Sequence, residues 1–190
     1  MILENLKDFE WFNEPENVLF TDKQMKIVSK PQTDFWQSIH HHFAKDTGHL
    51  FFVRKNDDFM VKVHWKAEDA SNFNQCGIMV RLDDKNWFKA SLMYKSHDAP
   101  EVGSCVTLRG HSDWAGVIME QEPSEMWYKL VRKQDDFIVS FSTDGENYIR
   151  LRQFYMDTSG AELKAGAYIC SPQDSYFEAV LDEIDFDIDF

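Results

Sequence analysis

The chain has 190 residues, of which 43% are hydrophobic and 15% aromatic, enough apolar surface for a packed core and too much for a disordered chain. Its formal net charge of −13 argues against binding to nucleic acid or anionic membranes, because phosphate recognition depends on clustered Lys and Arg. No segment resembles a signal peptide or a membrane span, so we expect one soluble domain over residues 1–190, located in the cytoplasm.

Strand signals dominate the chain. The best helical window, residues 33–43, follows a proline and contains three consecutive histidines, so we expect little helix. Further along, segments 59–65, 77–82, 87–94 and 127–132 alternate apolar and polar residues with a period of two, which predicts half-buried strands.

Turn residues separate these strands. Segments 83–86 and 132–136 have the composition of hairpin connections, and Asp144-Gly145 supplies the positive φ values of a tight turn. Many short strands without βα alternation predict an all-β fold, an antiparallel two-sheet β-sandwich of the jelly-roll kind. The cysteines, Cys76, Cys105 and Cys170, are far apart and lie in or beside apolar stretches, so we expect buried reduced thiols.

Several short motifs occur in an order that is typical of one family. They are Thr33-Asp34-Phe35-Trp36, Asp46-Thr47-Gly48-His49, Gln75-Cys76-Gly77-Ile78-Met79-Val80-Arg81, Asn86-Trp87-Phe88-Lys89-Ala90, Ser112-Asp113-Trp114, Ser142-Thr143-Asp144-Gly145 and Cys170-Ser171-Pro172. Together they resemble an uncharacterised family of concanavalin A-like domains in the lectin and glucanase superfamily. One fungal member of that family is described as a regulator of enolase.

The resemblance covers nearly the whole chain, from about Trp11 to Phe186, and it implies a concanavalin A-like jelly roll. It implies no reaction, because fold alone does not fix function. The chain departs from the family pattern at residues 39–42, Ile-His-His-His in place of Thr-His-Tyr-Gly, and at Met93, where relatives carry an acidic residue.

Period-two alternation divides the middle of the chain into two faces. The core face carries Cys76, Ile78, Val80, Leu82, Phe88, Ala90, Leu92 and Tyr94, and the other face carries Gln75, Arg81, Trp87 and Lys89. We expect this second face to form an open groove, which Trp36, His40, His49 and Trp114 would complete from neighbouring segments. Aromatic rings stack on sugars, and Arg, Lys and Gln reach hydroxyl or carboxylate groups. The alternative is that these side chains stabilise the sheet or belong to its core.

Two other patterns raise the question of a metal site or a catalytic site. His40 and His42 are the only pair of the His40–His42 run that could share an ion in a strand, and no nearby acidic or cysteine pair completes the four ligands of zinc. Glu183, Asp185 and Asp187 have the alternate spacing by which glycosidases of this fold place carboxylates on one face, but acidic residues also protect a closing strand from aberrant pairing.

The sequence therefore favours a non-catalytic module that binds a small carbohydrate or carbohydrate-like metabolite, with no cofactor and no metal. The alternatives are a carbohydrate-active hydrolase of the same fold and a regulatory domain that meets a protein partner or a second copy of itself.

Overall fold

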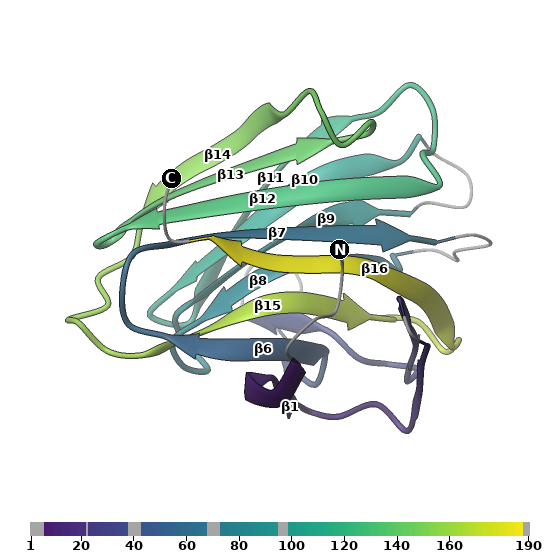
Figure 1. Cartoon of the computed structure of the whole chain (residues 1–190), viewed down its shortest axis with the longest axis horizontal. Helices are drawn as coiled ribbons and strands as arrows, with labels where there is room; N and C mark the ends of the chain where they lie inside the picture. Colours follow the sequence, from purple (N-terminus) through teal and green to yellow (C-terminus); the bar gives the residue numbers. More distant parts are fainter. Residues whose placement is uncertain (1–5, 22, 38–42, 68–72, 95–98, 188–190) are drawn as a thin grey trace.

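The computed structural model describes residues 6–21, 23–37, 43–67, 73–94 and 99–187. Two antiparallel seven-stranded sheets form a sandwich (Figure 1). Sheet A has the strand order β1-β6-β15-β8-β9-β10-β11, sheet B has the order β14-β13-β12-β7-β16-β3-β2, and β4 and β5 form a separate hairpin. The predicted all-β, two-sheet fold with almost no helix is confirmed.

The elements have the following bounds: η1 (Leu6–Asp8), β1 (Glu10–Phe12), β2 (Asn17–Phe20), β3 (Met25–Ser29), β4 (Phe35–Gln37), β5 (Ala44–Asp46), β6 (His49–Lys55), β7 (Phe59–Lys66), β8 (Gln75–Arg81), β9 (Trp87–Met93), β10 (Glu101–Leu108), β11 (His111–Ile118), β12 (Glu125–Lys133), β13 (Asp136–Ser142), β14 (Ile149–Tyr155), β15 (Leu163–Cys170) and β16 (Phe177–Asp187). The described residues contain no helix that is long and apolar enough to cross a membrane.

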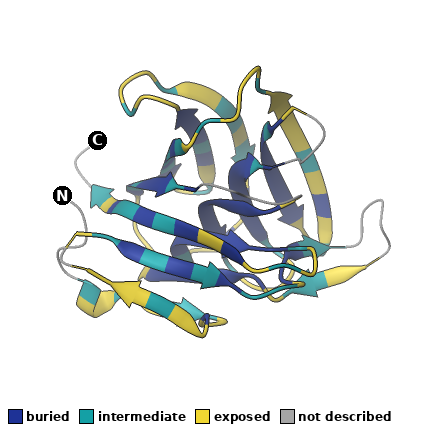
Figure 2. Cartoon of the chain, turned by 90° about the vertical axis from the view of Figure 1, so that its right-hand side faces the viewer, coloured by how far each residue is buried: buried dark blue, intermediate teal, exposed yellow. Residues whose placement is uncertain are grey.

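The main core lies between the two sheets, and strand alternation builds it. Along β12 and β3, buried residues alternate with partly exposed ones, as the banded strands in Figure 2 show. The four predicted strands are β7, β8, β9 and β12, and the side chains that we assigned to the core face of β8 and β9, among them Ile78 and Phe88, pack in this core.

Asp side chains fix two of the predicted turns. Asp83 Oδ1 accepts hydrogen bonds from the backbone N–H groups of Lys85 and Asn86, both at 2.8 Å. Asp144 Oδ1 accepts in the same way from the residues two and three positions later, and Gly145 has a φ of 77°. A short polar side chain that bonds to its own turn holds the chain reversal in place.

The hairpin of β4 and β5 covers the outer face of sheet A. Phe35 of β4 is fully buried there, in a second hydrophobic cluster that also contains Phe52, Met79, Trp87 and Tyr168 of sheet A. Part of the 33–43 window is therefore a strand that packs on the sheet. This cover decides which residues of sheet A can meet a ligand.

Candidate ligand-binding site

A cavity of about 840 Å³ lies where the hairpin meets the outer face of sheet A. Four of the eight residues that we predicted for the groove line it: Trp36, Gln75, Lys89 and Trp114. The rest of the lining comes from residues that we did not predict as ligand contacts: Met93, which alternation places on the groove face, and Asp34, Phe43, Phe73, Ser112, Asp113, Pro172 and Gln173. We call this cavity the sheet A pocket.

Lys89 and Asp34 form a buried ion pair at this pocket. Lys89 is 1% exposed, and its Nζ lies 3.0 Å from Asp34 Oδ1, which also accepts a 2.8 Å hydrogen bond from the Phe35 backbone N–H. Burial acts to lower the pKa of Lys89, but the charge of Asp34 and its hydrogen bond outweigh burial, and the pKa lies above its usual value. The ammonium group therefore stays charged beside the cavity.

Gln75 is oriented by its neighbours. Its Oε1 accepts a hydrogen bond from the Tyr168 hydroxyl at 3.1 Å, and its Nε2 donates to the backbone carbonyl of Phe73 at 3.2 Å. The Tyr168 hydroxyl is also 2.7 Å from Ser91 Oγ, inside the buried layer. The amide is thus fixed in direction before any ligand arrives, and the second amide hydrogen remains for a ligand.

Trp114 lies flat across β10, and a glycine makes this possible. A Cβ added to Gly103 would lie 2.2 Å from the Trp114 ring, well inside van der Waals contact. The indole Nε1 donates a 2.7 Å hydrogen bond to Glu101 Oε1 on the same strand. Trp114 is therefore held as a wall of the pocket.

The hairpin is attached to β11 at the pocket. Ser112 Oγ accepts a 3.0 Å hydrogen bond from the Gln37 backbone N–H and lies 2.7 Å from Thr107 Oγ1. Next to it, Asp113 is exposed and pairs with Arg152 at 2.9 Å. Ser112 thus fixes the distance between the Trp36 side and the Trp114 side of the cavity.

Arg81 does not line the sheet A pocket. Its guanidinium donates two hydrogen bonds to the two carboxylate oxygens of Asp46 on β5, both at 2.7 Å, and stacks over the Phe12 ring at 4.4 Å. It is 5% exposed. Arg81 therefore links the hairpin to sheet A. A bidentate pair whose guanidinium also stacks on an aromatic ring is a strong contact at a partly buried site.

Trp87 and His49 are also buried away from the pocket lining. Trp87 is fully buried against Phe35, at 6.2 Å between ring centroids. His49 shares its side of β6 with the core residue Phe51, so it turns away from the groove face. Its Nδ1 donates to the Asn13 carbonyl, and its Nε2 accepts from a backbone N–H at 3.2 Å. His40 lies outside the described residues.

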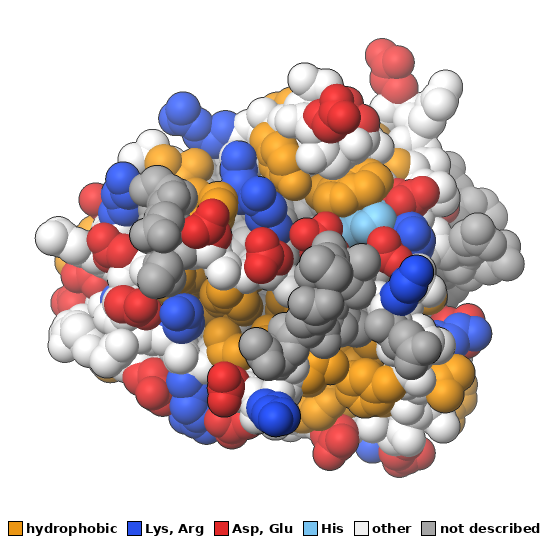
Figure 3. Space-filling model, in the orientation of Figure 1, with side chains coloured by type: hydrophobic (Ala, Val, Ile, Leu, Met, Phe, Trp, Pro, Cys, Tyr) orange, Lys and Arg blue, Asp and Glu red, His pale blue; other side chains and the backbone are white. Residues whose placement is uncertain are grey.

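The acidic residues of β16 lie on the opposite side of the sandwich. Ile184 and Phe186 face the core, so Glu183, Asp185 and Asp187 share the outer face of sheet B, where acidic, basic and hydrophobic side chains are intermixed (Figure 3). None of the three lines the sheet A pocket. Within the described part of the chain, no group of three or more His, Cys, Asp or Glu is arranged to hold a metal ion.

The pocket residues that alternation missed carried another signal. Asp34, Ser112, Asp113 and Pro172 all belong to the short motifs on which the family resemblance was based, and the fold brings those motifs together at one cavity. Shared motif membership was therefore a better guide to the pocket than strand alternation.

The fold and this cavity define a class: two-sheet jelly-roll domains with a pocket on the outer face of one sheet. The chain matches the family described as "Protein of unknown function (DUF1349)" over residues 11–188, and it belongs to that family. It is 27% identical over 163 residues to Regulation of enolase protein 1 of Saccharomyces cerevisiae, covering 86% of this chain and 81% of that protein. The predicted family is confirmed.

Two solved structures agree with the fold. A functionally unknown protein from Saccharomyces cerevisiae superposes with a TM-score of 0.88 at 25% identity, covering 96% of this chain and 97% of that one. The GH43 protein BlXynB from Bacillus licheniformis superposes with a TM-score of 0.74 at 14% identity, covering 94% of this chain but 36% of that one. The second likeness is one of fold, with part of a longer chain.

Proposed function

We propose that the protein is a non-catalytic binding module whose sheet A pocket takes a small carbohydrate or carbohydrate-like metabolite. The observation that carries this proposal is the composition of the pocket: aromatic walls, including Trp36 and Trp114, stand beside fixed polar groups, Gln75 and Lys89. Sugars present an apolar ring face and several hydroxyl groups, and this combination of stacking surface and directed donors suits them.

Each polar group has a distinct role in this proposal. The Lys89 ammonium donates one hydrogen bond to Asp34 and keeps donors for a ligand hydroxyl or carboxylate. Gln75 presents its remaining amide hydrogen in a fixed direction. The BlXynB structure adds support of a weaker kind, because GH43 is a glycoside hydrolase family and part of that chain shares this fold.

The test is a thermal-shift and calorimetric screen of the purified protein against mono- and oligosaccharides, sugar acids and sugar phosphates. A ligand at 100 times its Kd stabilises the folded state by about 2.7 kcal/mol. Trp36→Ala and Trp114→Ala should weaken binding at least tenfold, which corresponds to about 1.4 kcal/mol.

The matched control is Trp127→Ala. Trp127 lies on sheet B, where it stacks on His64 at 3.9 Å, away from the sheet A pocket. This variant should bind as the parent does. A screen in which no saccharide binds, or equal losses in all three Trp variants, would contradict the proposal.

A second candidate function is glycoside hydrolysis, because the pocket contains two carboxyl groups, Asp34 and Asp113. We favour binding because Asp34 already pairs with Lys89 and Asp113 with Arg152, and a glycosidase needs one carboxyl group that can carry a proton. Chromatography of an oligosaccharide after incubation with the protein separates the two functions. Products that form with the parent and disappear in Asp113→Asn, whose carboxylate is exposed, would establish the hydrolase, and an intact oligosaccharide that nevertheless binds supports the module.

A further inference from the structure

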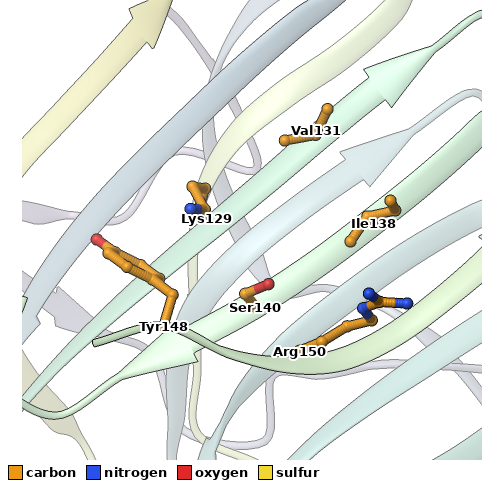
Figure 4. Close-up of a pocket in the computed structure, with 6 residues that line it drawn as sticks. All are labelled: Lys129, Val131, Ile138, Ser140, Tyr148 and Arg150. Carbon is orange, nitrogen blue, oxygen red and sulfur yellow. The ribbon is translucent and has the colours of Figure 1, made fainter. Parts of the chain in front are cut away.

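A second hollow lies on the outer face of sheet B, across the sandwich from the sheet A pocket. Its volume is about 350 Å³. It is lined by Lys129 and Val131 of β12, Ile138 and Ser140 of β13, Tyr148, and Arg150 of β14 (Figure 4). We call it the sheet B hollow.

Strand register places two cations on either side of a hydroxyl group. Lys129 is the direct cross-strand partner of Ser140, and Ser140 is the partner of Arg150. Adjacent strands are about 5 Å apart, so the backbones of Lys129 and Arg150 are separated by roughly 10 Å. Figure 4 shows Ser140 between Lys129 and Arg150. A group a few ångströms across, held above Ser140, is within reach of both long side chains.

These cations differ from others on the same sheet. Lys26 pairs with Glu178 at 2.7 Å, and Lys66 pairs with Asp182 at 3.2 Å. Among the residues that the structure describes, neither Lys129 nor Arg150 forms an ion pair with a carboxylate. In a chain with a net charge of −13, two neighbouring cations without a bonded carboxylate favour an anion between them. The charges of Glu183 and Asp144 act at the Tyr148 end of the hollow, where burial together with these charges raises the pKa of Tyr148.

Neighbouring groups set the limits of this site. The Lys129 ammonium lies over the Tyr148 ring, 4.3 Å from its centroid, which holds that side chain at one end. Beyond Lys129, the next cross-strand residues are Lys62 and then Asp185, so the nearest carboxylate along that row is separated from the site by a lysine. On the other side, β14 is the edge strand of sheet B, which leaves the Arg150 end open.

We propose that the sheet B hollow binds a small organic oxyanion through its phosphate or carboxylate group. The anionic group lies between Lys129 and Arg150 and accepts a hydrogen bond from Ser140 Oγ, and the carbon part of the ligand rests on Val131 and Ile138. Charge-assisted hydrogen bonds from Arg and Lys are the strong contacts available to such a group. This site is independent of the sheet A pocket and of its proposed function.

The test is a nuclear magnetic resonance titration of the ¹⁵N-labelled protein with inorganic phosphate and, separately, with acetate, both at constant ionic strength. We expect saturable shifts of the Ser140 and Arg150 amide signals with at least one probe, and the better probe identifies the preferred oxyanion. Arg150→Gln and Lys129→Gln should each weaken that binding at least tenfold. Arg150 is exposed and Lys129 is partly exposed, so these variants should fold as the parent does.

The control is Lys85→Gln, which removes the same charge from the turn between β8 and β9 in sheet A. Its affinity should equal that of the parent. Shifts that do not saturate with either probe, or equal weakening in all three variants, would overturn the proposal. Either result would mean that the anions act through non-specific electrostatics and not at a defined site. Trp114→Ala, which alters the sheet A pocket, should leave this titration unchanged. The result for the sheet B hollow therefore does not depend on whether the sheet A pocket binds a ligand.

Discussion

The two outer faces of the sandwich follow the same alternation of residues but differ in what covers them. On sheet A, the hairpin of β4 and β5 covers the polar face, so Lys89 and Arg81 are buried in ion pairs with Asp34 and Asp46. On sheet B, the corresponding face is not covered by a hairpin in the described structure, and its lysine–carboxylate pairs, such as Lys26–Glu178, are partly exposed to solvent. The contribution of a charged pair to stability should therefore depend on whether other chain segments cover that face of the sheet.

The largest effect is expected at the Lys89–Asp34 pair. Asp34→Asn leaves the Lys89 ammonium buried without its counter-charge, and the loss of one member of a buried pair costs about 3–5 kcal/mol. Urea unfolding measures the change. The double variant Asp34→Asn with Lys89→Met should lose less than Asp34→Asn alone, and a greater loss would show that the buried charge is not the cause.

A smaller effect is expected at Gly103. In Gly103→Ala, the new Cβ would overlap the Trp114 ring, and the required displacement should cost about 1–3 kcal/mol and weaken any ligand of the sheet A pocket. In a Trp114→Ala background, the ring is absent and the same change should cost almost nothing. Thermal unfolding of the four proteins in this cycle gives the coupling, and an equal cost in both backgrounds would exclude the steric explanation.

Burial also predicts a pH dependence at His49. Burial lowers the pKa of His49 in the folded protein, although the hydrogen bond to Asn13 opposes this. The unfolded state therefore binds more protons than the folded state once the pH falls below about 6.5, so the free energy of unfolding should decrease as the pH falls through that region. His49→Gln should flatten this dependence between neutral and acidic pH. An unchanged slope in denaturant unfolding would assign the effect to other groups.

The smallest effect is expected on sheet B. Lys26→Gln breaks the pair with Glu178, but both side chains are about half exposed, at 44% and 54%, so the loss should be below about 1 kcal/mol. Added salt should reduce the effect further. A decrease in the free energy of unfolding as large as that of Asp34→Asn would show that covering the face does not change the contribution of a charged pair.

The strands and their faces were predictable because a period of two is visible in the sequence. Ile78 and Phe88 face the main core, and Gln75 and Lys89 face the other way, as alternation requires. Alternation states which residues share a face, but it contains no information about what covers that face. The three-residue strands of the hairpin are too short to show a period, so the burial of Arg81 and Trp87 beneath it was not predictable.

The site was partly predictable for the same reason. Gln75, Lys89, Trp36 and Trp114 line the pocket, whereas His49 points to the core side of β6. The predicted groove assumed that the outer face of sheet A is open to solvent. In the structure, the hairpin of β4 and β5 covers part of this face, and the cavity lies at the edge of the hairpin. The contribution of Asp34 depends on a long-range contact across 55 residues, which no local pattern contains.

The attachment of the hairpin has a consequence for how the protein comes apart. The contacts between β4 and sheet A, such as the Gln37–Ser112 hydrogen bond, are separate from the main core between the sheets. The hairpin can therefore act as a unit of local opening that exchanges its amide hydrogens before the sandwich does. A ligand in the sheet A pocket touches both the hairpin and the sheet, so its binding would slow that exchange while the protection of β12 and β7 stays the same.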